Sequence, residues 1–528
     1  MMKPRTFSKV FQHRRVLCFV FAILCFHKVV SAQDSTATDQ TARPLGEIDI
    51  IRIQELHNIT DILGDEIWPG FDTRKIPVAI NNDDREELLI GHPNPPKEYH
   101  PFNDFELDGR PVMIRDGVNR YGPKGGGWAV EIGGKQAAYV STLKEGRDTE
   151  GYLALILHEC FHCFQKGYRQ RAEGAGGELP EDDPIYSAMI GLESRILKPA
   201  VDEPNDENVR ELAGMFVAVR HERRKDMPEK LIILEGEEEY NEGTANYSRA
   251  RMYQLIVENG GITPFNKGKD PQYHGFPNAG REYRRMISSA IPPKGRPVTF
   301  FHSMYQHGMA QCLILDRVRP KWKEQMSEKG MTQFALLEKE FPLQEDTEKE
   351  LLTKAKERFG YDDLLTEQTT LIDARLDLVR GYIDAPGRRY RIYHDRIRKR
   401  FKWKPFGPVY HVPESLEKEL AEKRKKQGHD EEKIAYRRIV WAGGIRRFEK
   451  DGLVFESGDT PVVYGHEFIE WFDPDPAPDN SDMNIECENR KAETYVGVKI
   501  KTDGFTLEAD KARIEWTEHV VRIYPIPE

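Results

Sequence analysis

The residues of this chain best suited to chemistry are His158, Glu159 and His162, which form an H-E-x-x-H motif. In an α-helix, positions four apart lie roughly 40° apart on one face and a turn apart along the axis, so both imidazoles can bind one zinc ion. Glu159 lies beside them, where a carboxylate can act as general base on a zinc-bound water. The motif therefore predicts metal-assisted hydrolysis, most often of a peptide bond.

The surrounding segment favours a buried helix. The apolar run 153–157 precedes the motif, Asp148 or Thr149 can cap the start of the helix, and Gly167 can end it. The alternative is an amphipathic helix that carries two surface histidines. A second matching motif downstream argues against that alternative.

Zinc held by two histidines needs a third protein ligand if one position is to stay open for water. The segment Tyr240–Tyr247 reads YNEGTANY and offers Glu242, followed by Gly243. Because glycine carries no side chain, we expect it to let this helix approach the histidine helix closely. Three other glutamates, expected on the same acidic helix as Glu242, remain alternative ligands: Glu235, Glu238 and Glu239.

With these two motifs the chain resembles the glutamate zincins (gluzincins), which include thermolysin and the aminopeptidase N type enzymes. Asn241-Glu242-Gly243 matches the stretch that carries the third ligand in the latter. The resemblance implies that His158, His162 and Glu242 bind one zinc ion and that Glu159 is the catalytic base. The spacing of eighty residues between His162 and Glu242 is much longer than in aminopeptidase N types. Helices predicted at 185–197 and 207–223 would fill this interval.

Two short strands are expected before the zinc helix, at 128–132 and 136–141, joined by Gly133-Gly134. Zincins typically place an edge strand beside the zinc helix, where a peptide substrate adds as a further strand. Glu131 lies where aminopeptidase N types anchor the free amine of the substrate, but the Gly-x-Met-Glu-Asn motif of those enzymes is absent. We therefore expect Glu131 to be an exposed strand residue and infer no aminopeptidase specificity.

A gluzincin also needs a donor, commonly Tyr or His, that stabilises the oxyanion of the substrate. A helix predicted at 300–322 carries Tyr305, which the resemblance makes the first candidate. The alternative is that Tyr305 only packs that helix against the core. The further candidates are His302, His307, Tyr247 and Tyr283.

The first 32 residues carry six Lys or Arg and no acid, then an apolar run from Val16 to Phe26, then small residues ending at Ala32. This pattern predicts a signal peptide cleaved after Ala32, and hence a secreted or periplasmic protein. Its loss changes the formal net charge from −10 to −16, so we expect no non-specific binding of nucleic acid. No later segment is long and apolar enough to span a membrane.

Four cysteines remain after this cleavage, too few for a disulfide scaffold in a chain of this length. Cys160 and Cys163 form a C-x-x-C inside the zinc helix. We expect them to be buried small apolar residues rather than redox or metal-binding groups.

The patterning predicts an α+β fold in two domains. A mainly helical, zincin-like domain with a small edge-strand sheet would span 33–386, and a β-rich accessory domain would span 387–528. The boundary is placed at Ala385-Pro-Gly387, beyond which short strands separated by turns dominate. A short helix is expected at 86–91.

These features predict an exported zinc-dependent peptidase with one zinc ion and a peptide or protein substrate. Two alternatives stay open. One is a catalytically inactive exported protein that keeps a zincin-like scaffold for binding, against which the intact His158, Glu159 and His162 argue. The other is a zinc hydrolase of a non-peptide amide or ester.

Overall fold

The structure is a computed structural model. It describes residues 43–393 except for 83–84, 118–120, 122–125, 145–146, 177–178, 181–182, 267, 290–297 and 385–387. Farther along it describes 409–411, 436–440, 448–450, 453–457, 462–465, 468–473, 484–491, 494–501, 505–516 and 520–526. The predicted signal peptide (1–32) and the predicted boundary at 385–387 lie outside these residues.

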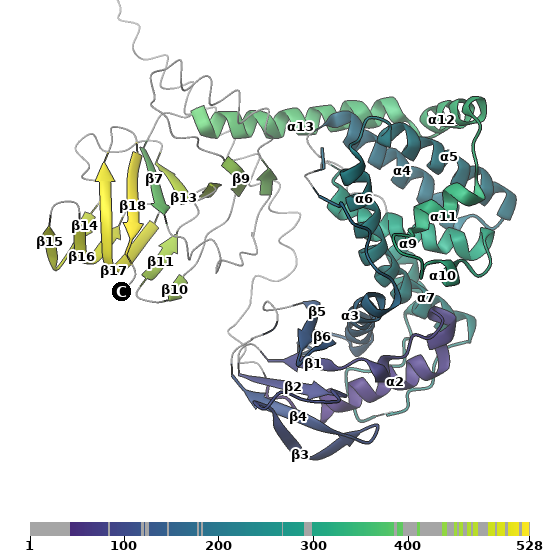
Figure 1. The fold of residues 1–528 in the computed structure, drawn as a ribbon, viewed down its shortest axis with the longest axis horizontal. Helices are drawn as coiled ribbons and strands as arrows, with labels where there is room; N and C mark the ends of the chain where they lie inside the picture. Colours follow the sequence, from purple (N-terminus) through teal and green to yellow (C-terminus); the bar gives the residue numbers. More distant parts are fainter. Residues whose placement is uncertain are drawn as a thin grey trace, which may run out of the picture.

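The predicted α+β fold is confirmed. A six-stranded sheet and a mainly helical body come first, and a second sheet follows at the end of the long helix α13 (Figure 1). The helices are α2 (Glu47–Ile67), α3 (Thr149–Tyr168), α4 (Pro184–Asp202), α5 (Asp206–Arg224), α6 (Glu229–Glu238), α7 (Thr244–Glu258), α8 (Ala279–Ser288), α9 (Phe300–Val318), α10 (Trp322–Gln325), α11 (Gln333–Glu340), α12 (Glu345–Phe359) and α13 (Tyr361–Asp384), with short turns η1 (Thr73–Lys75) and η2 (Glu239–Gly243).

The first sheet has the strand order β3-β4-β2-β1-β6-β5. Only the β1–β6 pair is parallel. Its strands are β1 (Val78–Asn81), β2 (Glu86–Ile90), β3 (His100–Leu107), β4 (Arg110–Asp116), β5 (Gly127–Ile132) and β6 (Lys135–Ser141). The two strands expected before the H-E-x-x-H helix are β5 and β6, and β5 is the terminal strand of the sheet, beside α3. The predicted edge strand is therefore present.

The helix predicted at 86–91 is wrong, because this segment is strand β2. Leu88 and Ile90 face the main core, whereas Leu89 faces a second cluster on the other side of the sheet. Pairing with β1 and β4 and burial on both faces outweigh the helix propensity of the segment. The β3–β4 hairpin was not predicted, although Asp108-Gly109 supplies the two positive φ angles that its tight turn requires.

Helix α3 forms as its sequence predicts. The Asp148 side chain caps it by accepting a hydrogen bond from the backbone N–H of Gly151 at 2.6 Å. Leu153, Leu157 and Phe161 are buried in the main core, so the apolar face of α3 packs the helix against that core. Helices α4 and α5, predicted between the two motifs, are present and occupy the long interval.

A buried network of ion pairs joins α4, α5 and the α6–η2 segment. Arg220 lies 2.6 Å from both Glu193 and Glu239, and Arg223 lies 2.7 Å from Glu193 and 2.6 Å from Glu235. All five side chains are almost fully buried. Because each charge has an opposite partner, the network fixes how α6 and η2 lie against α5.

The segment 239–243 forms a single π turn between α6 and α7. A π turn holds one residue more than an α turn, so it rotates the faces of the two flanking helices relative to each other. Glu235 and Glu239 thereby pair with arginines of α5, while Glu242 turns toward α3. The sequence had indicated one continuous acidic helix, and this interruption was not predicted.

The second sheet contains twelve described strands, in the order β10-β11-β17-β18-β7-β13-β12-β9-β8, with β16 on β17 and with β14 and β15 on β16. The strands are β7 (Arg388–Tyr393), β8 (Val409–His411), β9 (Tyr436–Val440), β10 (Phe448–Lys450), β11 (Leu453–Ser457), β12 (Val462–Gly465), β13 (Phe468–Asp473), β14 (Asn484–Glu486), β15 (Asn489–Lys491), β16 (Thr494–Lys501), β17 (Phe505–Trp516) and β18 (Val520–Pro525). This agrees with the expected β-rich C-terminal region. Among the helices described, none has both the length and the apolar character needed to cross a bilayer.

Gly243 packs against Gly308 of α9, and not against α3 as the sequence suggested. A Cβ atom at Gly308 would lie 2.5 Å from the carbonyl oxygen of Glu239 and 2.6 Å from the Cα of Gly243. Such distances exclude any side chain without a backbone shift. The two glycines thus set how closely α9 approaches the π turn.

We predict that Gly308→Ala lowers the free energy of unfolding by about 1–3 kcal/mol, because the added methyl group overlaps backbone atoms. Gly167→Ala is the matched control: it is also helical, and nothing lies within 4 Å of the Cβ position. The control should be neutral or slightly stabilising. Thermal unfolding followed by circular dichroism tests this, and an unchanged melting temperature for Gly308→Ala would contradict it.

Candidate metal centre

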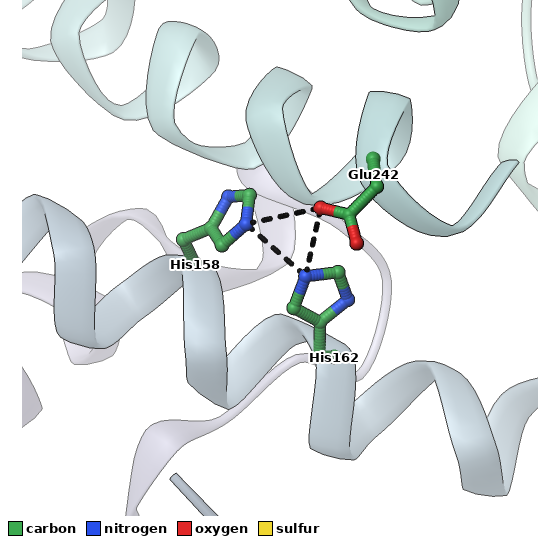
Figure 2. A group of neighbouring side chains, drawn as sticks. All are labelled: His158, His162 and Glu242. Atoms are coloured by element: carbon green, nitrogen blue, oxygen red, sulfur yellow. Dashed lines mark hydrogen bonds and ion pairs between the residues drawn. The ribbon is translucent and has the colours of Figure 1, made fainter. Parts of the chain in front are cut away.

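His158 and His162 project from α3 toward Glu242, which comes from the π turn η2 at the start of α7 (Figure 2). The two Nε2 atoms lie 3.1 Å apart, and Oε2 of Glu242 lies 3.6 Å from that of His158 and 3.4 Å from that of His162. Both histidines are buried, and the Glu242 side chain is only 16% exposed. The structure therefore brings the three residues that the sequence singled out into one compact group.

The spacing of these three atoms fits a small divalent ion. Ligand atoms about 2.0–2.2 Å from a tetrahedral zinc ion lie about 3.3–3.6 Å from one another. The observed triangle has sides of 3.1, 3.4 and 3.6 Å. Three protein ligands would leave the fourth tetrahedral position to water or substrate. The donor set, two imidazoles and one carboxylate, is one that suits zinc.

Gln165 orients His162, one helical turn farther along α3. Its amide nitrogen donates to the backbone carbonyls of Asn241 at 2.8 Å and Tyr240 at 3.3 Å, groups that can only accept. The amide oxygen of Gln165 must then accept from Nδ1 of His162, at 2.9 Å. This bond places a proton on Nδ1 and aims Nε2 at Glu242. Gln165 thus connects the histidine helix to the turn that carries the third acidic group, as outer partners of metal ligands do.

Burial and hydrogen bonding keep His158 neutral and Glu242 ionised, so both have lone pairs that can bind a metal ion. Burial lowers the pKa of His158 to about 4, so this imidazole is neutral at physiological pH. Although burial opposes it, hydrogen bonding to His158 and His162 holds the pKa of the Glu242 carboxyl well below its usual range. Burial also lowers the pKa of His162, but the Glu242 carboxylate outweighs it and raises that pKa overall. A metal ion would therefore displace a proton from His162 when it binds.

His158 is less well supported than His162. Its Nδ1 atom is buried and has no hydrogen-bond partner among the residues that the structure describes. The aromatic ring of Tyr305 lies parallel to it, with ring centroids 6.4 Å apart. The orientation of His158 is thus set by packing, whereas that of His162 is set by a hydrogen bond.

Glu159 lies against the edge strand. A Cβ atom at Gly127, the first residue of β5, would lie 2.6 Å from both Cγ and Oε1 of Glu159, so any larger residue there would displace the Glu159 side chain. Burial raises the pKa of Glu159 to about 7. Its carboxylate makes no hydrogen bond to any described residue. Gly127 was not noticed in the sequence, and nothing in its local pattern distinguishes it.

Tyr305 of α9 lies beside the group, as its ring contact with His158 shows. Burial, and after it the charge of Glu242, raises the pKa of Tyr305, so the phenol keeps its proton. A protonated phenol in this position can donate a hydrogen bond.

The other donor candidates lie in structural contacts or outside what is described. The hydroxyl of Tyr247 donates to Asp316 at 2.8 Å from within the core, and His307 is bonded to Ser194 at 2.7 Å. Burial and the charge of Asp202 raise the pKa of Tyr283 to about 12, and no acid of the metal group contributes to that shift. The side chain of His302 lies outside the described residues.

The rival acids for the third ligand are engaged elsewhere. Glu235 and Glu239 belong to the buried arginine network, and Glu238 pairs with Arg171 at 2.8 Å. Among the described His, Cys, Asp and Glu residues, the group His158, His162 and Glu242 is the one whose ligand atoms converge closely enough to hold an ion. Glu131 is exposed on β5, as expected, and Cys160 and Cys163 are buried free thiols.

Compared with known proteins, the chain matches no family model, no curated protein and no solved structure.

We predict that Glu242→Ala reduces bound zinc from one ion per chain to well below that value, because only two ligands remain. Glu238→Ala is the matched control, since it removes a nearby acid that has another partner. Both variants would be loaded with zinc, dialysed and analysed for metal by mass spectrometry. Full zinc content in Glu242→Ala would show that the third ligand is another residue.

We predict that Gln165→Leu weakens zinc binding by about 10- to 100-fold, because it frees the ring of His162 and removes the hydrogen bonds that join α3 to the turn. Competition with a chromogenic chelator measures the affinity. Lys166→Met, at the neighbouring and exposed position of α3, serves as the control. Equal affinities for the two variants would show that Gln165 does not position the site.

Proposed function

We propose that this protein is a zinc-dependent peptidase. The observation that carries the proposal is the convergence of His158, His162 and Glu242 on one point, with Glu159 beside them and against an edge strand. This is the set of groups that metal-assisted hydrolysis of an amide requires. The H-E-x-x-H and Asn-Glu-Gly motifs, which resemble those of gluzincins, support the same reaction.

Each residue of the site would have its own role in the reaction. His158, His162 and Glu242 would hold the ion, which when bound would polarise the scissile carbonyl and lower the pKa of water to about 7. Glu159 would take a proton from the attacking water and return it to the leaving amine. Its elevated pKa suits a group that must both accept and donate at neutral pH. The Tyr305 hydroxyl would donate to the developing oxyanion.

Strand β5 supplies the place for a peptide. It ends the described sheet, and Gly127 brings its backbone up to the Glu159 carboxylate. An extended peptide that pairs with this edge would pass directly in front of Glu159. Trp128, the next residue of the strand, is 43% exposed and offers an apolar surface to such a peptide.

We predict that Glu159→Gln keeps zinc but loses about 10²–10⁴-fold in the rate of peptide hydrolysis, because the amide cannot accept the proton. The measurement is cleavage of a mixed peptide library, read by mass spectrometry, beside the metal content. The control is Glu345→Gln, the same change at an exposed surface ion pair. A chelator should abolish wild-type cleavage, and added zinc should restore it.

Three outcomes would count against the proposal. Equal rates of cleavage by Glu159→Gln and the wild-type protein would show that Glu159 is not the general base. Cleavage of acyl esters or non-peptide amides, with none of peptides, would assign another class of zinc hydrolase. Zinc binding without any hydrolysis would identify a binding protein.

A further inference from the structure

Arg249 on α7 has no partner among the residues that the structure describes. Its Nε atom is buried and makes no hydrogen bond, and no described carboxylate lies within ion-pair distance. Burial lowers its pKa below the ordinary value, yet a guanidinium of this kind remains a cation in proteins. Leaving a partly buried cation without a partner costs stability, so its presence requires an explanation.

The fully buried arginines of the helical body and first sheet are all paired, whereas the partly buried Arg249 is not. Each forms a short ion pair with a carboxylate: Arg52 with Asp270, Arg115 with Glu87, Arg169 with Glu237, Arg220 with Glu193 and Arg223 with Glu235. This fold therefore neutralises its buried arginines as a rule. The exception lies on the helix that follows Glu242.

Arg249 also lies close to the proposed site. It is seven residues after Glu242, which in a helix is two turns later on almost the same face and about 10 Å along the axis. Helical side chains tilt toward the N-terminus, so the guanidinium leans back toward Glu242. Helix α7 packs against α3, which carries His158 and Glu159. The guanidinium is thus within electrostatic reach of the metal ligands and the base.

The acid that could have neutralised it is already paired. On α8, Glu282 and Arg285 both act electrostatically on Arg249, and they form an ion pair with each other at 2.7 Å. Tyr253, one turn farther along α7, has its pKa raised to about 12 by burial and therefore remains a neutral phenol. The remaining acid that acts on Arg249 is Glu159, the proposed base, and it lies beyond ion-pair distance.

We infer that Arg249 binds a carboxylate of the substrate, so that the protein prefers peptides with a negative group close to the scissile bond. A carboxylate accepts two parallel hydrogen bonds from a guanidinium, which fixes its position as well as its charge. At about 3.4 Å per extended residue, the distance along α7 places this group within about three residues of the bond. Either the C-terminal carboxylate of a peptide or an Asp or Glu side chain provides the same chemistry.

This inference rests on the proposed function, but its test does not need turnover. The zinc-loaded Glu159→Gln protein would be titrated by calorimetry with short peptides of one sequence in three forms: free C-terminal acid, C-terminal amide, and amide with one glutamate. We expect a carboxylate form to bind at least about tenfold tighter than the neutral amide. The form that binds more tightly shows whether Arg249 binds the C-terminal carboxylate or an acidic side chain.

Arg249→Met in the same background should abolish this preference and leave the affinity for the neutral amide unchanged, while Arg249→Lys should keep part of it. Arg251→Met is the control, because Arg251 lies on the same helix and pairs with Glu258. Equal binding of all three forms, no binding of the carboxylate forms, or a preference that survives Arg249→Met would overturn the inference.

A stability measurement separates binding from a purely structural role. Removing an unpartnered buried cation should leave the melting temperature of the metal-free protein unchanged or raise it. A marked fall for Arg249→Met would show that the arginine serves the fold, and would contradict the inference. If the carboxylate preference is found but the wild-type protein cleaves no peptide, peptide hydrolysis fails while the assignment of Arg249 stands.

Discussion

Three electron-rich atoms that point at one another from within a folded protein repel unless a positive charge lies between them. Nε2 of His158, Nε2 of His162 and Oε2 of Glu242 are held 3.1–3.6 Å apart in a largely buried place. A proton on His162 relieves part of this repulsion, and a divalent cation would relieve all of it. Most of the surrounding architecture can be understood as the means of keeping these atoms together.

Several contacts outside the site hold Glu242 close to the two histidines. Arg220 and Arg223 tie the segment before the π turn to α4 and α5, and the Gly243–Gly308 contact sets its distance from α9. Gln165 then joins His162 to the turn itself. Because these three atoms come from α3 and from the π turn, the position of Glu242 relative to α3 depends on interactions that neither element makes alone.

The sequence predicted those parts of the site that depend on local periodicity or on a matched motif. The spacing of His158 and His162 on a capped apolar helix gave the first half, and Asn241-Glu242-Gly243 gave the second. The mistakes share a cause. The helix predicted at 86–91 and the regular helix predicted through 239–243 are both wrong. Sheet pairing and buried ion pairs decide these two segments, and they involve residues far apart in the chain, which local patterns do not reveal. Gln165 could have been found, since it lies three residues after His162 on the same face.

The central claim is that the two imidazoles and the Glu242 carboxylate share one zinc ion. X-ray absorption at the zinc edge of the full-length, zinc-loaded protein tests this most directly. The account predicts four nitrogen or oxygen neighbours at about 2.0–2.2 Å, with the outer-shell pattern of two imidazoles. Failure to retain zinc, or sulfur neighbours at about 2.3 Å that would indicate ligation by Cys160 or Cys163, would contradict it.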